Sequence, residues 1–119
     1  MPEPRIVCVD FNGVLDDYTG WKGADHFDEP RRGARAFLEG LRARGYEIVI
    51  FTTRYEPDVW AWVRAHGFEA LIAAITDRKP AAHVFVDDRA VCFRGDFDAT
   101  LREIDSFAAH WESSPGQTR

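Results

Sequence analysis

The sequence predicts an α/β fold, in which a parallel β-sheet lies between layers of helices and the chain forms one domain. Short runs rich in β-branched residues alternate with segments in which apolar residues recur at helical spacing. This alternation is typical of parallel sheets joined by right-handed crossovers. Polar and charged residues directly follow three of the apolar runs. A length of 119 residues allows one domain with a substantial core but not two.

Three strands are predicted from short apolar runs. Residues 6–11 and 47–52 ("EIVIFT") are mostly apolar and β-branched, as buried strands are. Residues 83–86 ("HVFV") follow the same pattern. Residues 71–75 are either a further short strand or an extension of the preceding helix, and residues 91–93 are a candidate fifth strand.

Helical periodicity predicts the remaining elements. Apolar residues recur at helical spacing through residues 31–44, and Gly45 stands where a glycine commonly ends a helix. A second helix begins at Pro57, a position at which helices tolerate proline, and ends near Gly67. Residues 98–111 place their apolar side chains on one face and predict a closing helix.

The other segments read as irregular structure. Residues 12–30 are rich in glycine and aspartate and are predicted to form an irregular excursion or a small hairpin. We therefore expect one catalytic-type core over residues 1–111, with a flap loop at residues 13–30. Residues 112–119 read as a loose C-terminal tail.

Composition excludes several classes of protein. The net charge of −5 disfavours a broad basic surface for duplex nucleic acid, although a local basic pocket stays possible. Cys8 and Cys92 both lie in apolar, strand-like runs, which predicts reduced interior cysteines rather than a disulfide framework. The first ten residues carry no long apolar stretch, so neither a signal peptide nor a membrane span is predicted. We expect a cytoplasmic protein.

Polar residues at the ends of the predicted strands define a candidate site. In parallel α/β sheets, ligands bind where the carboxyl ends of the strands meet. Three carboxylates in one cleft repel each other unless a cation or a proton joins them, and an all-oxygen ligand set favours Mg²⁺ beside phosphate. A lysine, an arginine and a threonine hydroxyl supply the charge and hydrogen bonds that a phosphate needs. The residues in question are Asp10, Thr52, Thr53, Arg54, Lys79, Asp87, Asp88 and Arg89.

Each of these residues also has an ordinary structural reading. An acid after a strand is often a turn former or a helix cap, and this applies to Asp10 as well as to the pair Asp87 and Asp88. Thr52 is an ordinary strand residue, and Lys79 before a proline is compatible with a solvated loop. A purely structural role is a good explanation for any one of these residues, but it is a poor explanation for all of them at once.

The same residues resemble the motifs of the haloacid dehalogenase superfamily of phosphatases and phosphotransferases, over residues 6 to about 109. "VDFNGVL" resembles its first motif, D-x-D-G-[TV], with an amide where the second acid belongs. "VIFTTR" resembles the second motif, Lys79 fits the third, and "VFVDD" resembles the fourth, in the family's order. The segments "FTTR", "RKP" and "DDR" also resemble the phosphatase portions of polynucleotide end-processing enzymes, more weakly.

This resemblance implies a Rossmann-like three-layer fold and a specific division of roles. Asp10 would attack phosphorus and form an aspartyl-phosphate, while Thr52 would hold a phosphoryl oxygen. Lys79 would neutralise charge and orient the nucleophile. Asp87 and Asp88 would anchor Mg²⁺, with Asp88 as the direct contact, and the backbone carbonyl of Asn12 would complete the metal site.

Asn12 is the departure from the family's pattern. In the family's phosphatases the second acid protonates the leaving group and then activates water, and an amide does neither. Asn12 can still donate a hydrogen bond to the leaving oxygen. The sequence leaves three explanations open: a slow or specialised phosphohydrolase, a phosphate-binding module with little turnover, or an engineered amide that traps substrate.

The loops are too short for the cap domain that large members of this superfamily insert, because the flap loop and residues 54–79 are short or filled by predicted elements. An open site suits a phosphate at the end or surface of a macromolecule, or else requires a partner subunit, such as a second copy, that covers it. A nucleotide or a nucleic-acid end is the candidate substrate. Trp21 in the flap loop is a candidate stacking platform for a base or sugar. Packing of this tryptophan on the domain is the alternative.

The leading expectation is thus a capless Mg²⁺-dependent phosphohydrolase, and the alternative is a catalytically weak binding or regulatory module. A phospho-receiver signalling domain also combines clustered acids, a threonine and Lys-Pro. Receivers, however, place the acidic pair after the first strand and Lys-Pro last, whereas here Asp87 and Asp88 follow Lys79 and Pro80.

Overall fold

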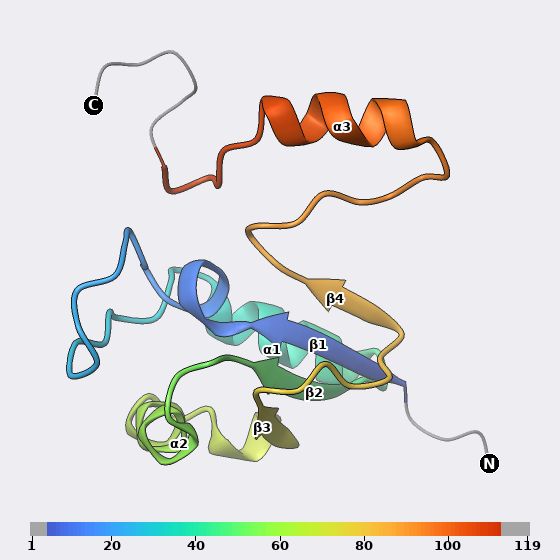
Figure 1. Ribbon diagram of the computed structural model, residues 1–119. Helices are drawn as coiled ribbons and strands as arrows, with labels where there is room; N and C mark the ends of the chain where they lie inside the picture. The colour runs from blue at the N-terminus through green and yellow to red at the C-terminus, as the bar shows by residue number, and fades with distance from the viewer. Residues whose placement is uncertain (1–4, 113–119) are drawn as a thin grey trace.

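The structure is a computed structural model that describes residues 5–112. Its centre is a four-stranded, all-parallel sheet with the strand order β3-β2-β1-β4 (Figure 1). The predicted α/β class is therefore confirmed, and a Rossmann-like arrangement accounts for the sheet and its helices. The strands are β1 (Ile6–Asp10), β2 (Glu47–Phe51), β3 (Ala74–Thr76) and β4 (Val84–Val86). The helices are α1 (Ala34–Ala43), α2 (Glu56–Ala65) and α3 (Phe97–Asp105), with single turns η1 (Phe11–Leu15) and η2 (Glu69–Leu71).

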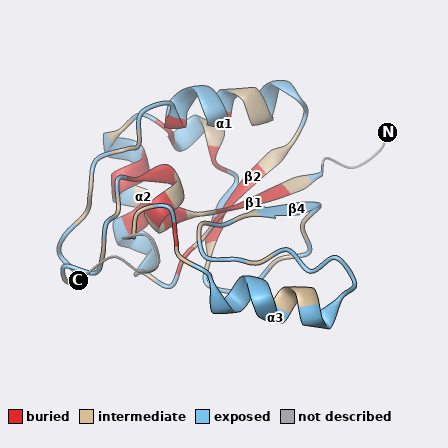
Figure 2. Cartoon of the chain, turned by 90° about the horizontal axis from the view of Figure 1, so that it is seen from above, coloured by how far each residue is buried: buried red, intermediate tan, exposed pale blue. Residues whose placement is uncertain are grey.

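The core lies between one face of the sheet and the helices α1 and α2. Burial is concentrated on β1, β2 and the inner side of α2 (Figure 2). The buried side chains of this cluster include Val9 and Ile50 from neighbouring strands, Leu38 from α1, and Val59 and Trp62 from α2. Two helices thus cover the same sheet face, as right-handed crossovers from β1 to β2 and from β2 to β3 require.

Two helix boundaries follow from glycine. α1 begins three residues later than predicted, after Gly33, which has a positive φ of 90°. It ends as predicted before Gly45, whose φ of 87° lets its N–H and that of Tyr46 return to carbonyls of the last turn. Pro57 occupies the first turn of α2, also as predicted.

The C-terminal part of the fold departs from the sequence prediction in three ways. Residues 74–76 form a strand, which resolves the open choice for residues 71–75, whereas residues 91–93 form none. α3 stops at Asp105 rather than continuing to residue 111. Cys92 is exposed, and only Cys8 is buried, although both cysteines are free as predicted. Apolar residues in a run favour a strand only where a neighbouring strand offers hydrogen bonds, and residues 91–93 have none.

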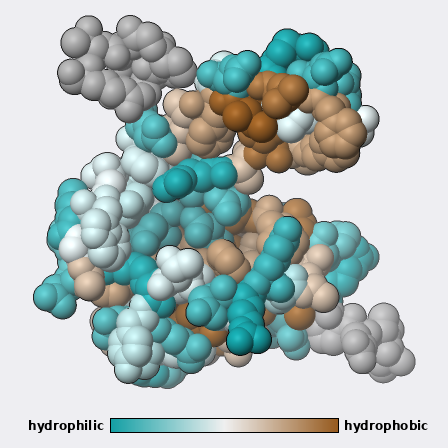
Figure 3. Space-filling model, in the orientation of Figure 1, coloured by the Kyte–Doolittle hydropathy of each residue, from teal (hydrophilic) through white to brown (hydrophobic). Residues whose placement is uncertain are grey.

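α3 and α1 lie on opposite sides of the strands (Figure 2), and the apolar side chains of α3 are exposed. Phe97 is 77% exposed and Leu101 is 58% exposed. Apolar surface is accordingly visible on this part of the molecule (Figure 3). The periodicity of α3 predicted its helical state correctly but not the degree of its burial.

The flap loop is closed at its base. Asp16 and Pro30 form an isolated antiparallel bridge, and the Asp17 N–H donates to the Glu29 carbonyl at 2.9 Å. The segment is therefore an irregular excursion with a paired base, one of the two forms that its composition predicts. Residues 54–79 hold only α2, η2 and β3, so the described chain carries no cap domain.

Within residues 5–112, no helix combines the length and the apolar character needed to cross a membrane. The predicted tail at residues 112–119 lies outside the described residues except for Glu112.

Candidate metal and phosphate site

The candidate site lies at the carboxyl edge of two neighbouring strands. Asp10 is the last residue of β1, and Asp87 and Asp88 directly follow β4, which pairs with β1 so that Val86 lies opposite Val9. This pairing brings the three carboxylates together: one oxygen from each lies within 4.8 Å of the other two. The convergence predicted from sequence is present.

The acidic cluster disturbs the protonation of Asp10. Burial, a hydrogen bond with Asp88 and the negative charge of Asp87 raise the pKa of Asp10 from 3.8 to about 8. Three carboxylates this close cannot all be ionised without a compensating positive charge. The cluster therefore binds a proton near neutral pH, and a divalent cation at the same position would replace it.

These residues fit Mg²⁺ by their chemistry. They offer only carboxylate oxygens from a compact set, which are the ligands that a hard cation prefers. Asp87 is in addition a turn former, because its Oδ1 accepts the N–H of Arg89 at 2.8 Å. The predicted contribution of the Asn12 backbone carbonyl stays a prediction.

One cavity of about 440 Å³ collects most of the predicted site residues. Thr52 is 6% exposed and follows β2 directly, with its Oγ1 accepting the N–H of Arg54 at 3.1 Å. Its hydroxyl hydrogen stays free to donate, as a phosphoryl-oxygen ligand must. The predicted residues that line the cavity are Asp10, Asn12, Trp21, Thr52, Thr53, Arg54, Asp87, Asp88 and Arg89, joined by Tyr18 and Phe51.

Lys79 is the predicted site residue that the fold leaves outside this cavity. It lines an adjacent hollow of about 660 Å³ that shares Asp10, Phe51 and Asp87 with the first. Its ammonium lies 4.7 Å from the centre of the Phe85 ring. A role of Lys79 at the phosphate therefore stays a prediction and requires its flexible side chain to turn toward Asp10.

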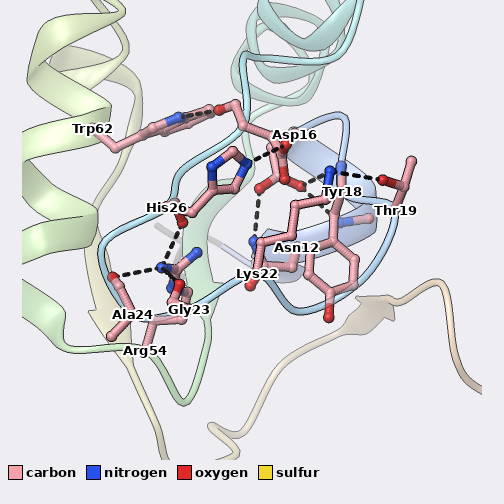
Figure 4. Close-up of polar contacts among 12 residues, drawn as sticks. Asn12, Asp16, Tyr18, Thr19, Lys22, Gly23, Ala24, His26, Arg54 and Trp62 are labelled. Atoms are coloured by element: carbon pink, nitrogen blue, oxygen red, sulfur yellow. Dashed lines mark hydrogen bonds and ion pairs between the residues drawn. The ribbon is translucent and has the colours of Figure 1, made fainter.

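Arg54, which follows β2, contacts the flap loop (Figure 4). Nη2 of Arg54 donates to the carbonyls of Ala24 at 2.9 Å and His26 at 2.7 Å. Its guanidinium also lies over the Phe27 ring at 3.7 Å and over the Trp21 ring at 5.1 Å. Arg54 thus fastens the flap loop to the end of β2, which the sequence did not predict. Trp21 lines the cavity and is 63% exposed, although the Arg54 guanidinium lies over its ring.

Asp16 is a buried acid that the sequence analysis did not single out. It is fully buried and accepts three hydrogen bonds: from Asn12 Nδ2 at 2.6 Å, from the Gly13 N–H at 2.8 Å and from the Tyr18 N–H at 3.2 Å (Figure 4). Burial raises the pKa of Asp16, and these hydrogen bonds oppose the rise. The Asn12 amide nitrogen therefore points to Asp16. The only sequence signal was an acid four residues after Asn12, which is weak.

Gly13 is required by the same turn. Its φ is 90°, and a Cβ at this position would overlap the Asp88 carboxylate and lie 2.9 Å from Nε1 of Trp111. The positive φ lets the chain turn sharply away from β1, and the close approach of Asp88 is a second reason for glycine at this position.

Asp16→Ala is expected to lower the free energy of unfolding by roughly 2–4 kcal/mol, because it leaves buried backbone N–H groups without acceptors. Asp17→Ala is the matched control: its side chain is 57% exposed and lies 4.0 Å from Arg31, so its loss should cost less than about 1 kcal/mol. Urea denaturation of both variants measures the difference. Equal midpoints would show that the Asp16 hydrogen bonds do not hold the turn.

Comparison with known proteins supports the fold alone. No family model and no curated protein matches the chain. A conserved protein from Bacteroides thetaiotaomicron has a similar structure, with a TM-score of 0.60 and 22% sequence identity, over 87% of this chain and 91% of that one. Fold and site together define a single-domain parallel α/β protein with an acidic cluster at the carboxyl edge of its sheet.

Proposed function

We propose that the protein is a Mg²⁺-dependent phosphohydrolase that acts through an aspartyl-phosphate on an exposed phosphate monoester. The observation that carries the proposal is the meeting of Asp10, Asp87 and Asp88 within 4.8 Å, in one cavity with the buried hydroxyl of Thr52. A cluster of three carboxylates takes up a proton or a cation, and a cation beside the Thr52 hydroxyl would create a site for a tetrahedral anion.

Asp10 is the proposed nucleophile. A carboxylate oxygen of Asp10 forms a bond to phosphorus while the bond from phosphorus to the leaving oxygen breaks, and the leaving oxygen takes a proton from solvent where it needs one. Water then attacks phosphorus and loses a proton to solvent, the bond from phosphorus to the Asp10 oxygen breaks, and phosphate and the Asp10 carboxylate are released. Thr52 donates its hydroxyl hydrogen to a phosphoryl oxygen. Asp87 and Asp88 hold Mg²⁺, which supplies positive charge to the phosphoryl oxygens when bound.

Asn12 limits this chemistry. Asn12, two residues after the proposed nucleophile, has a side chain that does not titrate. Loss of general acid–base catalysis typically costs about 10²–10⁴ in rate. Substrates whose leaving group needs no proton should therefore react best. The proposed phosphohydrolase is accordingly a slow one.

The open cavity bears on the substrate. The described chain has no cap domain, and the exposed ring of Trp21 stands beside the cavity. An aromatic face next to a phosphate site suits a base or sugar. Nucleotides and nucleic-acid ends are the substrates to test first.

A catalytically weak binding module is the second candidate. It is favoured by one observation: Asp16 holds one N–H of the Asn12 amide at 2.6 Å, so that only the second N–H, which does not titrate, is left for a leaving group. Such a module would keep Mg²⁺ and phosphate binding and show no turnover.

Mg²⁺ is expected to raise the melting temperature, because a ligand that binds only the folded state stabilises it, by about 2.7 kcal/mol at 100 times its dissociation constant. Differential scanning fluorimetry in millimolar MgCl₂ and in EDTA measures the shift. Asp88→Asn should abolish it, whereas Asp77→Asn, an exposed acid just after β3, should not. Equal melting temperatures of the unaltered protein with Mg²⁺ and with chelator would contradict the metal site and both candidate functions.

A further inference from the structure

The end of the described chain returns to the acidic cluster. After α3, the backbone runs back to the turn that follows β1, where Ala109 is 2% exposed. His110 Nε2 lies 2.6 Å from the Gly13 carbonyl oxygen, and because a carbonyl only accepts, this nitrogen carries the hydrogen. Trp111 Nε1 donates to Oδ2 of Asp88. Residues 110 and 111 are thus hydrogen-bonded to the two segments that follow β1 and β4, both of which are distant from them in sequence.

The Trp111 indole is itself held in place. Its ring packs edge-to-face against Tyr18, with 5.0 Å between the ring centres and an angle of 85° between the planes. Tyr18 is in turn anchored through its N–H to the buried Asp16. The direction of the indole N–H is therefore set by packing and not by Asp88 alone.

An indole N–H has one chemical ability at this position. It donates a hydrogen bond, accepts none and carries no charge that would compete with a cation. With Oδ2 of Asp88 bound to Trp111, the Asp88 carboxylate cannot rotate freely. Groups that orient metal-ligating side chains in this way typically change metal affinity by about 10–100-fold.

We propose that Trp111 is a positioning residue of the candidate metal site, which orients the Asp88 carboxylate toward Asp10 and Asp87 through its indole N–H. The inference rests on the proposed function. It makes Mg²⁺ binding and docking of residues 109–111 mutually dependent: each strengthens the other by the same factor, because the coupling between two binding events is reciprocal.

Calorimetric titration with MgCl₂ tests this inference without any activity measurement. Trp111→Phe keeps an aromatic ring for Tyr18 and removes the donor, so its Mg²⁺ dissociation constant should rise about 10–100-fold. Trp111→His restores a ring N–H and should recover part of the loss. Trp60→Phe is the matched control, because Trp60 is a half-buried α2 residue outside both cavities, and it should bind as the unaltered protein does.

The outcomes separate the two proposals. Equal Mg²⁺ affinity of Trp111→Phe and the unaltered protein would overturn the positioning role and leave the proposed function standing. Absence of Mg²⁺ binding by the unaltered protein would overturn both. If the variants fail to unfold cooperatively in EDTA, the ¹⁵N–¹H spectrum of the unaltered protein decides. Mg²⁺ should shift the Trp111 indole resonance, and an unmoved resonance during binding would overturn the positioning role.

Discussion

Asp10→Asn is expected to reduce phosphate-ester hydrolysis by at least about 1,000-fold, because it removes the proposed nucleophile. Beryllofluoride should bind to the unaltered protein only in the presence of Mg²⁺ and should not bind to the variant. The two measurements report separate steps, formation of the phosphoryl-like adduct and turnover. Equal beryllofluoride binding by both proteins would contradict the assignment of Asp10 as the nucleophile.

The same substitution should stabilise the metal-free protein at alkaline pH. The pKa of Asp10 is about 8 in the folded protein against 3.8 as its ordinary value. A raised pKa of an acid means that the folded state holds the proton more tightly, so its contribution to stability is full below about pH 4 and falls as the pH rises toward about 8. Asparagine does not titrate and escapes this loss.

Melting temperatures in EDTA measure this effect. Asp10→Asn should melt higher than the unaltered protein by at least about 4 °C near pH 8.5, which corresponds to about 1 kcal/mol in a domain of this size, and the difference should shrink toward pH 4 to 5. Mg²⁺ should reduce this difference in melting temperature, because the cation neutralises the charge of the carboxylates that the Asp10 proton neutralises in the metal-free protein. Asp77→Asn, which removes an exposed acid outside the 440 Å³ cavity, is the control. A difference in melting temperature that does not depend on pH would show that the pKa of Asp10 is not raised in the folded protein.

Asn12→Asp is expected to raise hydrolysis of a nucleoside monophosphate by at least about 10-fold, below the usual contribution of a general acid and base. p-Nitrophenyl phosphate should respond less, because its leaving group scarcely needs a proton. Unchanged rates on both substrates in this variant and in the double variant Asn12→Asp/Asp16→Asn, with Mg²⁺ binding intact, would contradict the hydrolase proposal and leave the binding module as the better account.

Asp16 makes this experiment sharper. In the present structure Asn12 Nδ2 donates to Asp16 Oδ2 at 2.6 Å, so a carboxylate at position 12 would meet the buried Asp16 carboxylate and one of them would have to keep a proton. The double variant Asn12→Asp/Asp16→Asn exchanges the two groups. The new amide at position 16 can donate to position 12 and still accept the N–H groups of Gly13 and Tyr18, which both bind Oδ1.

Comparison of the single and double variants separates chemistry from stability. The double variant should unfold at a urea concentration close to that of the unaltered protein, whereas Asn12→Asp alone should be less stable at neutral pH. A gain in rate that appears only in the double variant would show that repulsion from Asp16 distorts the site in the single variant. Asp16→Asn alone is the control for changes at position 16.

The sequence determined the elements and the edge of the sheet at which the acids meet. Apolar spacing, Gly45 and Pro57 predict three strands, β1, β2 and β4, and two helices, α1 and α2. These signals are local, because each acts within one turn or one strand. The meeting of Asp10 with Asp87 and Asp88 also follows, since parallel strands that neighbour each other end at the same edge.

Only the tertiary structure decided which side chains contact each other across the site. Asp16 holds Asn12, Arg54 fastens the flap loop, and Trp111 reaches Asp88 from the far end of the described chain. Lys79 lies over Phe85 in the neighbouring hollow, so its predicted contact with phosphate stays a prediction. The physical reason is that periodicity reports which face of an element is apolar, whereas a hydrogen bond depends on the distance and angle between atoms that the folded backbone alone brings together.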